Sequence, residues 1–235
     1  MKITSRLAGL ALVAVFLGSS ACRTALEADD EVAVLETNYG RIVIEFLPRV
    51  APKHVKNFKG LAETGFYDET KFHRIVKDKN QPVAIQGGDP NTINGDPAIW
   101  GQGQRGQRLV SSEISNLKHE RGIVSAARRP DDINSATSQF FLCVAAYPGF
   151  DGQFSIFGRV IEGMNVVDSI ALAPTEPKTD RPVDPVIVNR AYIIKRAELK
   201  APAEQALLPA LSSKSVVELN AGQAVMPVPG LLKEH

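Results

Sequence analysis

The chain has 235 residues, of which 44% are hydrophobic and 23% charged, so its composition is that of an ordinary globular protein. The formal net charge of +1 argues against a protein that binds nucleic acid or anionic membrane surfaces through charge. The four histidines have no metal-ligand spacing with one another or with the two cysteines. We therefore expect no metal site.

The first 21 residues have the pattern of a secretion signal. Lys2 and Arg6 precede an apolar run over residues 7–17, and small residues follow at 18–21. The run is too short to cross a membrane as a helix, and polar residues begin directly after Cys22. Removing residues 1–21 deletes two cations and no acid, which moves the net charge from +1 to +1 − 2 = −1.

Two cleavage sites compete at the end of this signal. Ser19 and Ala21 suit an ordinary signal peptidase, whereas Ala21-Cys22 resembles the end of a bacterial lipobox, in which Cys22 becomes the lipidated first residue. We favour a lipoprotein of the bacterial periplasm or cell envelope, and a soluble secreted protein with a free terminal thiol is the alternative. If Cys22 is lipidated, no disulfide forms within the chain, and we expect Cys143 to be a small buried hydrophobe.

A domain over residues 32–198 is expected after a short linker over 22–31. It opens with two alternating apolar runs around Asn38-Tyr39-Gly40, which predict a β-hairpin. A helix follows over 50–65, because Pro52 suits a first turn, apolar residues recur at helical spacing, and Gly65 suits the end.

Short apolar runs separated by turn residues make up most of the remaining domain. They are "KFHRIV", "PVAIQG", "RGIVSAA", "SQFFLCVAA", "QFSIFGRVI" and "DPVIVNRAYIIKRA", with one further helical pattern in "GMNVVDSIAL". Strands that do not alternate with helices predict a mainly β fold, an antiparallel barrel or sandwich flanked by two helices. Residues 199–235 are richer in Ala and Pro and are set apart as a tail that is either a flexible appendage or holds a short helix.

Two polar residues interrupt apolar strand faces. Arg74 in "FHRIV" shares a face with Phe72 and Val76, so a cation stands where alternation asks for a hydrophobe. Gln139 in "SQFFLCV" shares a face with Phe141 and Cys143, while Phe140 and Leu142 lie on the other face. A strand that is apolar on both sides with one directed amide is typical of a ligand site beside a core.

In order and spacing, the segments "FHRIV", "QGGD", "NG", "RGIVSAA", "SQFFLCVA" and "FDGQFSIFGRVIEGMNVVDSI" resemble the cyclophilin family of peptidyl-prolyl cis-trans isomerases. The resemblance covers about residues 32–197. It implies a closed eight-stranded antiparallel barrel capped by two helices, an active groove on its outer surface, no cofactor, and proline-containing polypeptides as partners of a monomer.

An X-Pro bond rotates over a barrier of about 20 kcal/mol, because the nitrogen lone pair is shared with the carbonyl. A catalyst needs a donor aimed at the twisted prolyl nitrogen and an apolar pocket for the ring. By resemblance, Arg74 is the donor and Gln86 steers Arg74 or the substrate carbonyl. The resemblance also implies a substrate-binding set of His73, Val83, Ala84, Ala127, Arg128, Gln139, Phe141, Phe150 and Phe154.

Several positions depart from the family pattern. The segment between Arg74 and Gln86 is longer than the compact family loop, and Val83 and Ala84 stand where large apolar residues are usual. Arg128 replaces the usual asparagine. These changes leave a second hypothesis open, a catalytically weak peptide-binding module or chaperone, and a third, an envelope assembly factor held through its tail.

The alternative to a catalytic role is that Arg74 is a purely structural arginine, paired with an acid such as Asp89 or Glu113. Similarly, His54 and His119 are expected on a helix surface and in a loop. The stretch "GQGQRG", residues 101–106, matches a dinucleotide-binding pattern but lacks the preceding strand and following helix, so we expect a loop at the rim of the groove.

Overall fold

The computed structural model describes residues 30–199. The strands are β1 Glu31–Thr37, β2 Gly40–Phe46, β3 Arg74–Asp78, β4 Gln81–Gly87, β5 Ile123–Ala126, β6 Phe140–Cys143, β7 Ile156–Glu162 and β8 Val188–Lys195. The helices are α1 Pro52–Glu63, α2 Asn91–Asn94 and α3 Met164–Ala171, with short 3-10 helices η1 Pro97–Ile99, η2 Pro148–Phe150 and η3 Arg196–Glu198. The predicted signal, Cys22 and residues 200–235 of the predicted tail lie outside the described residues.

The predicted hairpin and both predicted helices are confirmed. β1 and β2 pair antiparallel around the turn after Thr37, with Thr37 opposite Gly40. Pro52 occupies the first turn of α1, where its missing N–H costs no hydrogen bond, and the chain leaves the helix through Gly65 at φ +70°. In α3, the buried face is apolar at helical spacing through Val166, Val167 and Ile170.

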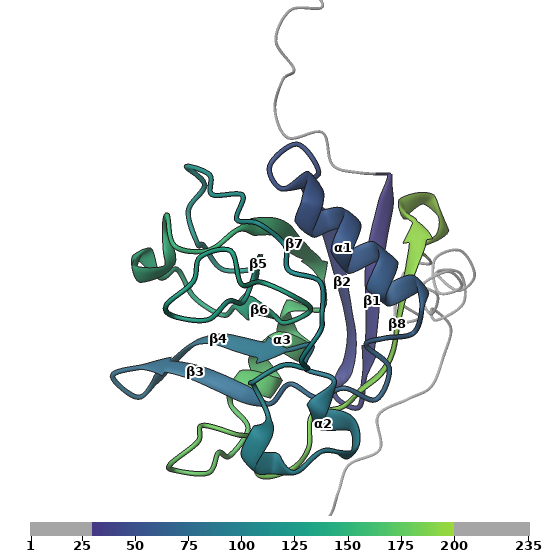
Figure 1. The fold of residues 1–235 in the computed structure, drawn as a ribbon. Coiled ribbons are helices and arrows are strands. Elements are labelled where there is room, and N and C mark those ends of the chain that lie inside the picture. Colours follow the sequence, from purple (N-terminus) through teal and green to yellow (C-terminus); the bar gives the residue numbers. More distant parts are fainter. Residues whose placement is uncertain (1–29, 200–235) are drawn as a thin grey trace, which may run out of the picture. The chain divides into compact units, whose positions relative to one another are not determined.

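The strands form one antiparallel sheet in the order β3-β4-β6-β5-β7-β2-β1-β8. Figure 1 shows this sheet strongly curved, with α1 lying beside β1, β2 and β8. Its concave side is filled by an aromatic core in which Phe58 of α1 contacts the rings of Phe46, Tyr67, Phe140 and Phe157. Such a core brings α1 against the sheet and fixes the direction of β6.

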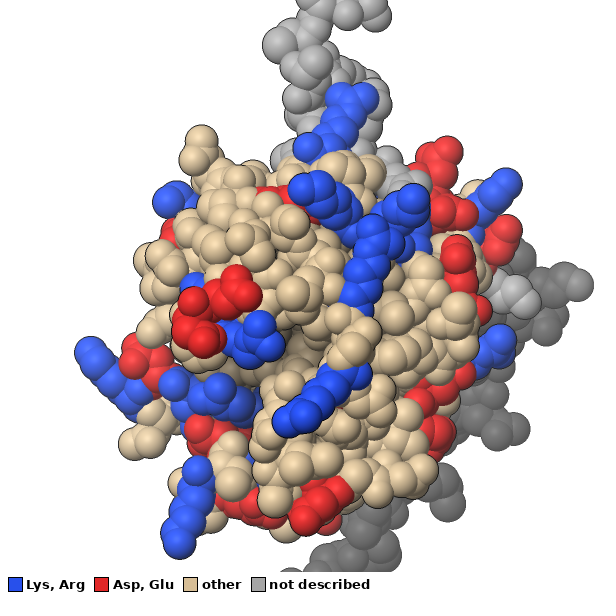
Figure 2. Space-filling model, viewed as in Figure 1, with Lys and Arg blue, Asp and Glu red and all other residues tan. Residues whose placement is uncertain are grey.

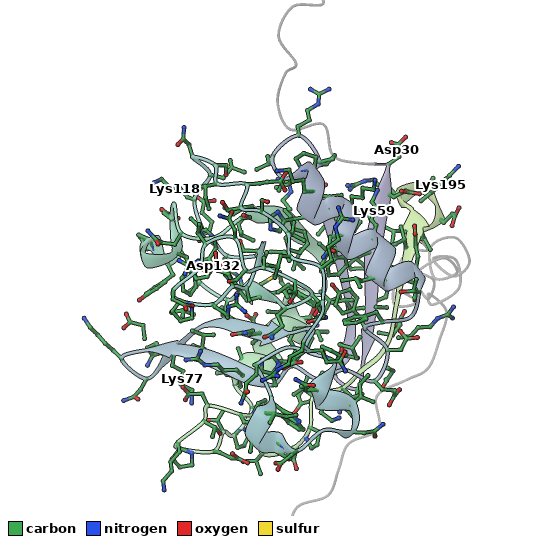
Figure 3. The ribbon with its side chains drawn as sticks, viewed as in Figure 1. Asp30, Lys59, Lys77, Lys118, Asp132 and Lys195 are labelled. Atoms are coloured by element: carbon green, nitrogen blue, oxygen red, sulfur yellow. The ribbon has the colours of Figure 1, made fainter. Side chains whose placement is uncertain are left out.

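The prediction of a closed barrel is wrong, because the sheet is an open half-barrel with β3 and β8 at its edges. Two hydrogen bonds run from this edge to the irregular segment before β8, from Phe72 N, just before β3, to Val186 O at 2.9 Å and from Ile75 N, within β3, to Asp180 O at 2.8 Å. Lys77 of β3, labelled in Figure 3, adds a hydrogen bond from Nζ to Thr175 Oγ1 at 2.6 Å. A loop thus lies where a ladder would close the barrel.

The extra residues between Arg74 and Gln86 extend the β3–β4 hairpin. Its turn is made by Lys79 and Asn80, which both have positive φ, as a tight hairpin turn requires. Asp78 pairs with Gln81 at the turn, and Arg74 pairs directly with Gln86 at the other end. The insertion therefore lies at the far end of the hairpin and leaves the Arg74–Gln86 register intact.

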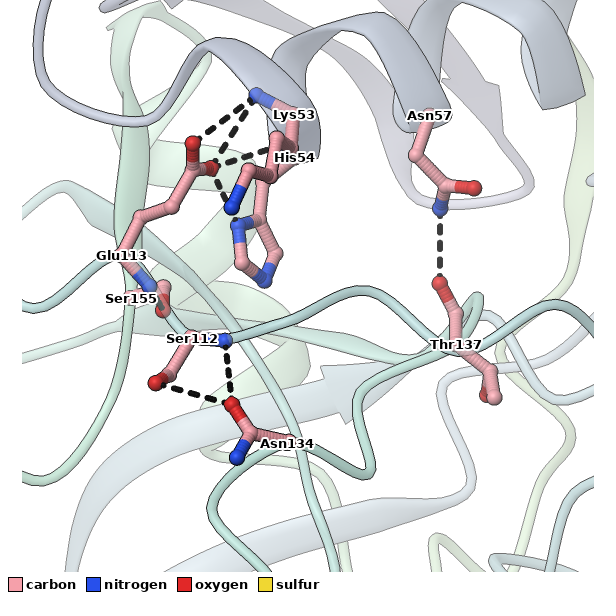
Figure 4. A network of polar contacts seen from close by, with 8 residues as sticks. All are labelled: Lys53, His54, Asn57, Ser112, Glu113, Asn134, Thr137 and Ser155. Carbon is pink, nitrogen blue, oxygen red and sulfur yellow. Dashed lines mark hydrogen bonds and ion pairs between the residues drawn. The ribbon is translucent and has the colours of Figure 1, made fainter.

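The loop after η1 is attached to the start of α1 by Glu113. Its carboxylate accepts from the backbone N–H of Lys53 at 3.1 Å and of His54 at 3.0 Å, and lies 2.7 Å from His54 Nδ1 (Figure 4). Further along α1, Asn57 donates to Thr137 O at 2.7 Å. The expectation that His54 lies on the helix surface is wrong, since its side chain is buried against Glu113.

Candidate active site

The two predicted catalytic residues and one predicted substrate-binding residue lie in one row across three neighbouring strands. Arg74 of β3 is directly opposite Gln86 of β4, and Gln86 is directly opposite Phe141 of β6. Because side chains opposite each other in antiparallel strands share a face, these three lie on the same outer face of the sheet. The row therefore consists of a guanidinium, an amide and an aromatic ring, in that order across the three strands.

Gln86 and Gln139 are joined side chain to side chain. Gln86 Nε2 donates to Gln139 Oε1 at 3.0 Å, and Gln139 Nε2 donates to the carbonyl of Gly101 at 3.0 Å. Asp89, which is fully buried, holds the same loop by accepting from the N–H of Gly101 and Gly103. The loop that begins the "GQGQRG" stretch is therefore fixed against the row.

An aromatic cluster lies at the Phe141 end of the row. The Phe141 ring centroid is 5.0 Å from that of Phe150 and 5.2 Å from that of Phe154, and Phe141 itself is buried. Phe150 and Phe154 remain half-exposed, so the cluster keeps an open apolar surface. Ala84 and Ala127 pack against the same cluster. Rings around a small-residue floor are suited to hold a proline ring.

The remaining residues with predicted substrate contacts are divided between two faces. Arg128 lies over the ring of Phe154 at 5.0 Å, and its guanidinium donates to the carbonyls of Arg129, Pro130 and Gln153, so it is held as part of the wall. Val83, in contrast, alternates with Ala84 and shares the face of Ile85. Among the described residues, Val83 is therefore not part of the aromatic cluster around Phe141.

His119 is a site residue that the sequence reasoning missed. Its ring stacks on Phe141 at 6.0 Å between centroids, its Nδ1 lies 3.2 Å from Asp151 Oδ1, and its Nε2 lies 3.0 Å from the hydroxyl of Ser125. Burial lowers the pKa of His119, opposed by the hydrogen bond and charge of Asp151. The neutral ring thus supports Phe141 from behind. A histidine two residues after Leu117 in a turn-rich segment carries no sequence signal for that role.

The side chain of Arg74 is exposed and makes no hydrogen bond or ion pair within residues 30–199. The two acids that a structural arginine would have paired with are engaged elsewhere, Asp89 with backbone amides and Glu113 with the start of α1. A guanidinium beside an apolar cluster with its donors unoccupied is available to a ligand. This geometry favours a functional Arg74.

His73 directly precedes Arg74 and, unlike Arg74, has a buried side chain. Its backbone N–H donates to Gln86 O at 3.0 Å. The ring contacts the backbone of Lys71, but neither ring nitrogen forms a hydrogen bond of normal geometry within the described residues. Burial lowers the pKa of His73 to about 4, against the charge of Asp89, which raises it. The ring is therefore neutral near pH 7 and offers one donor and one acceptor.

The surface around this face is charged unevenly. Figure 2 shows a hollow near the centre of the face, with Lys and Arg side chains at its border, a group of Asp and Glu side chains beside it and further acids around the edge of the view. No three His, Cys, Asp or Glu side chains of the described part group as metal ligands. None of the helices in residues 30–199 has the length and apolar character that a membrane span needs.

Comparisons with known proteins identify the family and the fold. The sequence profile of the family "Cyclophilin type peptidyl-prolyl cis-trans isomerase/CLD" matches residues 32–193. Peptidyl-prolyl cis-trans isomerase-like 1 of Neurospora crassa is 39% identical over 173 residues, which cover 73% of this chain and 98% of that protein. Its Homo sapiens counterpart is 38% identical over 164 residues, covering 67% and 89%.

A solved structure is similar over the same region. It is that of a Cryptosporidium parvum cyclophilin type peptidyl-prolyl cis-trans isomerase in the presence of the dipeptide Ala-Pro, with 31% identity and a TM-score of 0.61. The match covers 70% of this chain and 99% of that one. The family match, these relatives and the row from Arg74 to Phe141 lead to one conclusion: the chain belongs to the cyclophilin-type peptidyl-prolyl cis-trans isomerases.

Proposed function

We propose that Arg74 accelerates X-Pro isomerisation by donating a hydrogen bond to the prolyl nitrogen while the proline ring rests on Phe141, Phe150 and Phe154. The observation that carries the proposal is the unpaired guanidinium of Arg74, placed two strands from the aromatic cluster. The prolyl nitrogen accepts a hydrogen bond only when the peptide bond is twisted, so this donor favours the transition state over either planar isomer.

Other groups hold the substrate in place. Gln86 is bonded to Gln139, so its side-chain oxygen is oriented for a peptide N–H, and the backbone around Ala127 runs beside an extended substrate. The relative from Cryptosporidium parvum was solved with Ala-Pro, which supports a proline-containing ligand for this groove. The substrates we propose are polypeptides that fold in a bacterial cell envelope.

The test is the rate of cis-trans isomerisation of a short X-Pro peptide. We expect wild type to accelerate it, Arg74→Ala to lower kcat/KM about 100-fold, and Arg74→Lys to recover only part of the rate. Arg190→Ala is the matched control, because Arg190 is an exposed arginine of β8 that lies over Tyr192. Equal loss in both alanine variants, or full activity in Arg74→Ala, would refute the role of Arg74. Binding of the peptide without acceleration would favour the binding module.

The envelope location is a second part of the proposal. It rests on the charged and apolar pattern of residues 1–21 and on Cys22 directly after it. Expression of the full chain in a bacterium, followed by mass spectrometry of its N-terminal peptide, should find a diacylated Cys22 in the membrane fraction. Cys22→Ser should move the protein to the soluble periplasm. An unprocessed chain in the cytoplasm would overturn this part.

A further inference from the structure

A hollow separate from the aromatic cluster opens beside Arg74 and Gln86. It has a volume of about 440 Å³ and opens between β3, β4, the chain after η1 and the segment before β8. Its walls include His73, Arg74, Gln86, Trp100, Thr179 and Arg181. Because Arg74 and Gln86 also belong to the catalytic row, the hollow is continuous with the groove.

The hollow is lined by two arginines, and none of the described residues that line it is an aspartate or glutamate. Arg181 is positioned by three contacts, a hydrogen bond from Nη2 to Pro97 O at 2.8 Å, the Trp100 ring at 4.7 Å, and Glu176 at 3.8 Å. Glu176 also accepts from the hydroxyl of Thr179 at 2.7 Å. Arg181 is thus paired with one acid at 3.8 Å, whereas the Arg74 side chain has none within residues 30–199. The side chains that line the hollow carry two positive charges and no negative one, with Asp89 close enough to His73 to raise its pKa.

His73 supplies an independent sign of a ligand. Its side chain is only 5% exposed and lines the hollow. The ring contacts the backbone of Lys71, but neither ring nitrogen forms a hydrogen bond of normal geometry within residues 30–199. A buried polar group without a hydrogen bond is costly, so a ligand oxygen that reaches the ring would be stabilised. The positive charge and this donor both favour an oxyanion.

We propose that this hollow binds the carboxylate of an acidic substrate residue close to the isomerising proline. The inference rests on the proposed function, since it assigns part of the substrate to a pocket beside the same groove. Arg74 and Phe141 are separated by two strand spacings, which is about 10 Å and corresponds to about three residues of extended chain. The acidic residue therefore lies within three positions of the proline.

The chain contains a built-in reporter for this test. Trp100 is its one tryptophan, and it lies in the wall of the hollow against Arg181. Peptides blocked at both ends, with glutamate at each of the three positions on either side of one proline, are titrated while Trp100 emission is followed. Each is compared with the same peptide carrying glutamine, so that shape is kept and only the charge changes.

We expect at least one glutamate peptide to half-saturate the signal at about five-fold lower concentration than its glutamine twin. The difference should shrink at high salt, because part of the pocket is open to solvent. In calorimetric titrations Arg181→Gln should abolish the preference, whereas Arg190→Gln on β8 should keep it. Equal affinities at every position, or a preference that survives Arg181→Gln, overturn the proposal.

The isomerisation assay separates the two proposals. Catalysis with no glutamate preference would remove the acidic pocket and leave the isomerase mechanism intact. A glutamate preference at Trp100 without catalysis dependent on Arg74 would support the pocket and overturn the mechanism. With neither catalysis nor preference, both proposals are wrong.

Discussion

Gln139 reaches Gln86 and Gly101 at once, accepting from Gln86 Nε2 and donating to Gly101 O, each across 3.0 Å. One amide thereby connects the row of Arg74, Gln86 and Phe141 to the loop that begins the "GQGQRG" stretch. The two bonds use the two halves of the amide, so they can be removed separately by substitution.

Gln139→Glu keeps an acceptor for Gln86 and removes the donor to Gly101, while Gln139→Leu removes both. We expect Gln139→Glu to lower kcat/KM a few-fold and Gln139→Leu about ten-fold, since the second change also frees Gln86. Isomerase kinetics at several peptide concentrations measure the effect. Equal rates in the two variants would show that the bond to Gln86 has no part in catalysis.

Phe140 and Phe141 are neighbours in β6 that serve opposite faces. Phe140 lies in the core against Phe58 and Tyr67, whereas Phe141 lies in the aromatic cluster of the groove. We expect Phe140→Leu to reduce the free energy of unfolding by about 1 to 2 kcal/mol and to leave kcat/KM unchanged. Phe141→Leu should reduce kcat/KM about ten-fold. Urea denaturation and isomerase kinetics on both variants are the measurements, and a reversed pattern would contradict the division of faces.

Glu113 caps α1 from a distant loop, so its charge should matter to stability. Glu113→Gln leaves one oxygen for the backbone amides of Lys53 and His54 but removes the negative charge at the helix start. We expect a loss of about 1 kcal/mol in the free energy of unfolding. Glu63→Gln, at the exposed end of the same helix, should change it by less than about 0.5 kcal/mol. Similar losses in both would rule out the cap.

Stability should fall between pH 7 and pH 5. Burial lowers the pKa of His54 and His119 and brings that of His73 to about 4, all below the ordinary value of 6.5. In that pH range the unfolded chain binds protons that the folded chain does not, so the free energy of unfolding decreases as the pH falls. His73 alone accounts for about 2 kcal/mol of the decrease.

His73→Gln removes that titration. Urea denaturation at pH 7 and pH 5 should therefore show a smaller decrease in the variant, by about 2 kcal/mol. An identical pH dependence in wild type and variant would mean that folding does not lower the pKa of His73.

The order of the elements and the aromatic part of the site are predictable because they depend on local patterns. Alternation in "SQFFLCV" predicts that Phe141 and Cys143 leave the core face, and both lie in the outer cluster, where Cys143 is fully buried. Burial raises the pKa of that thiol to about 12, in keeping with a structural residue. The family resemblance likewise indicates Arg74, Gln86 and Gln139, which strand pairing and a hydrogen bond bring together.

What escaped prediction depends on segments that are distant in sequence. Closure of the sheet is decided by whether the chain before β8 runs as a strand beside β3, and hydrophobic patterning does not report on that irregular segment. The roles of His119, Asp89 and Glu113 follow from partners that only the folded chain supplies. Arg181 similarly reaches the groove from a loop more than a hundred residues after Arg74.

The cap on α1 has a consequence for the order of assembly. Pro52 and Lys53 begin the helix, but the carboxylate that satisfies its first amides comes from Glu113, 60 residues later than Lys53. No cap is contributed by the side chain at the start of the helix itself. The ribosome must therefore synthesise β3, β4 and the loop after η1 before the amides at the start of α1 can be capped. We expect the amides of α1 to gain their full protection from hydrogen exchange at the same time as the loop that carries Glu113.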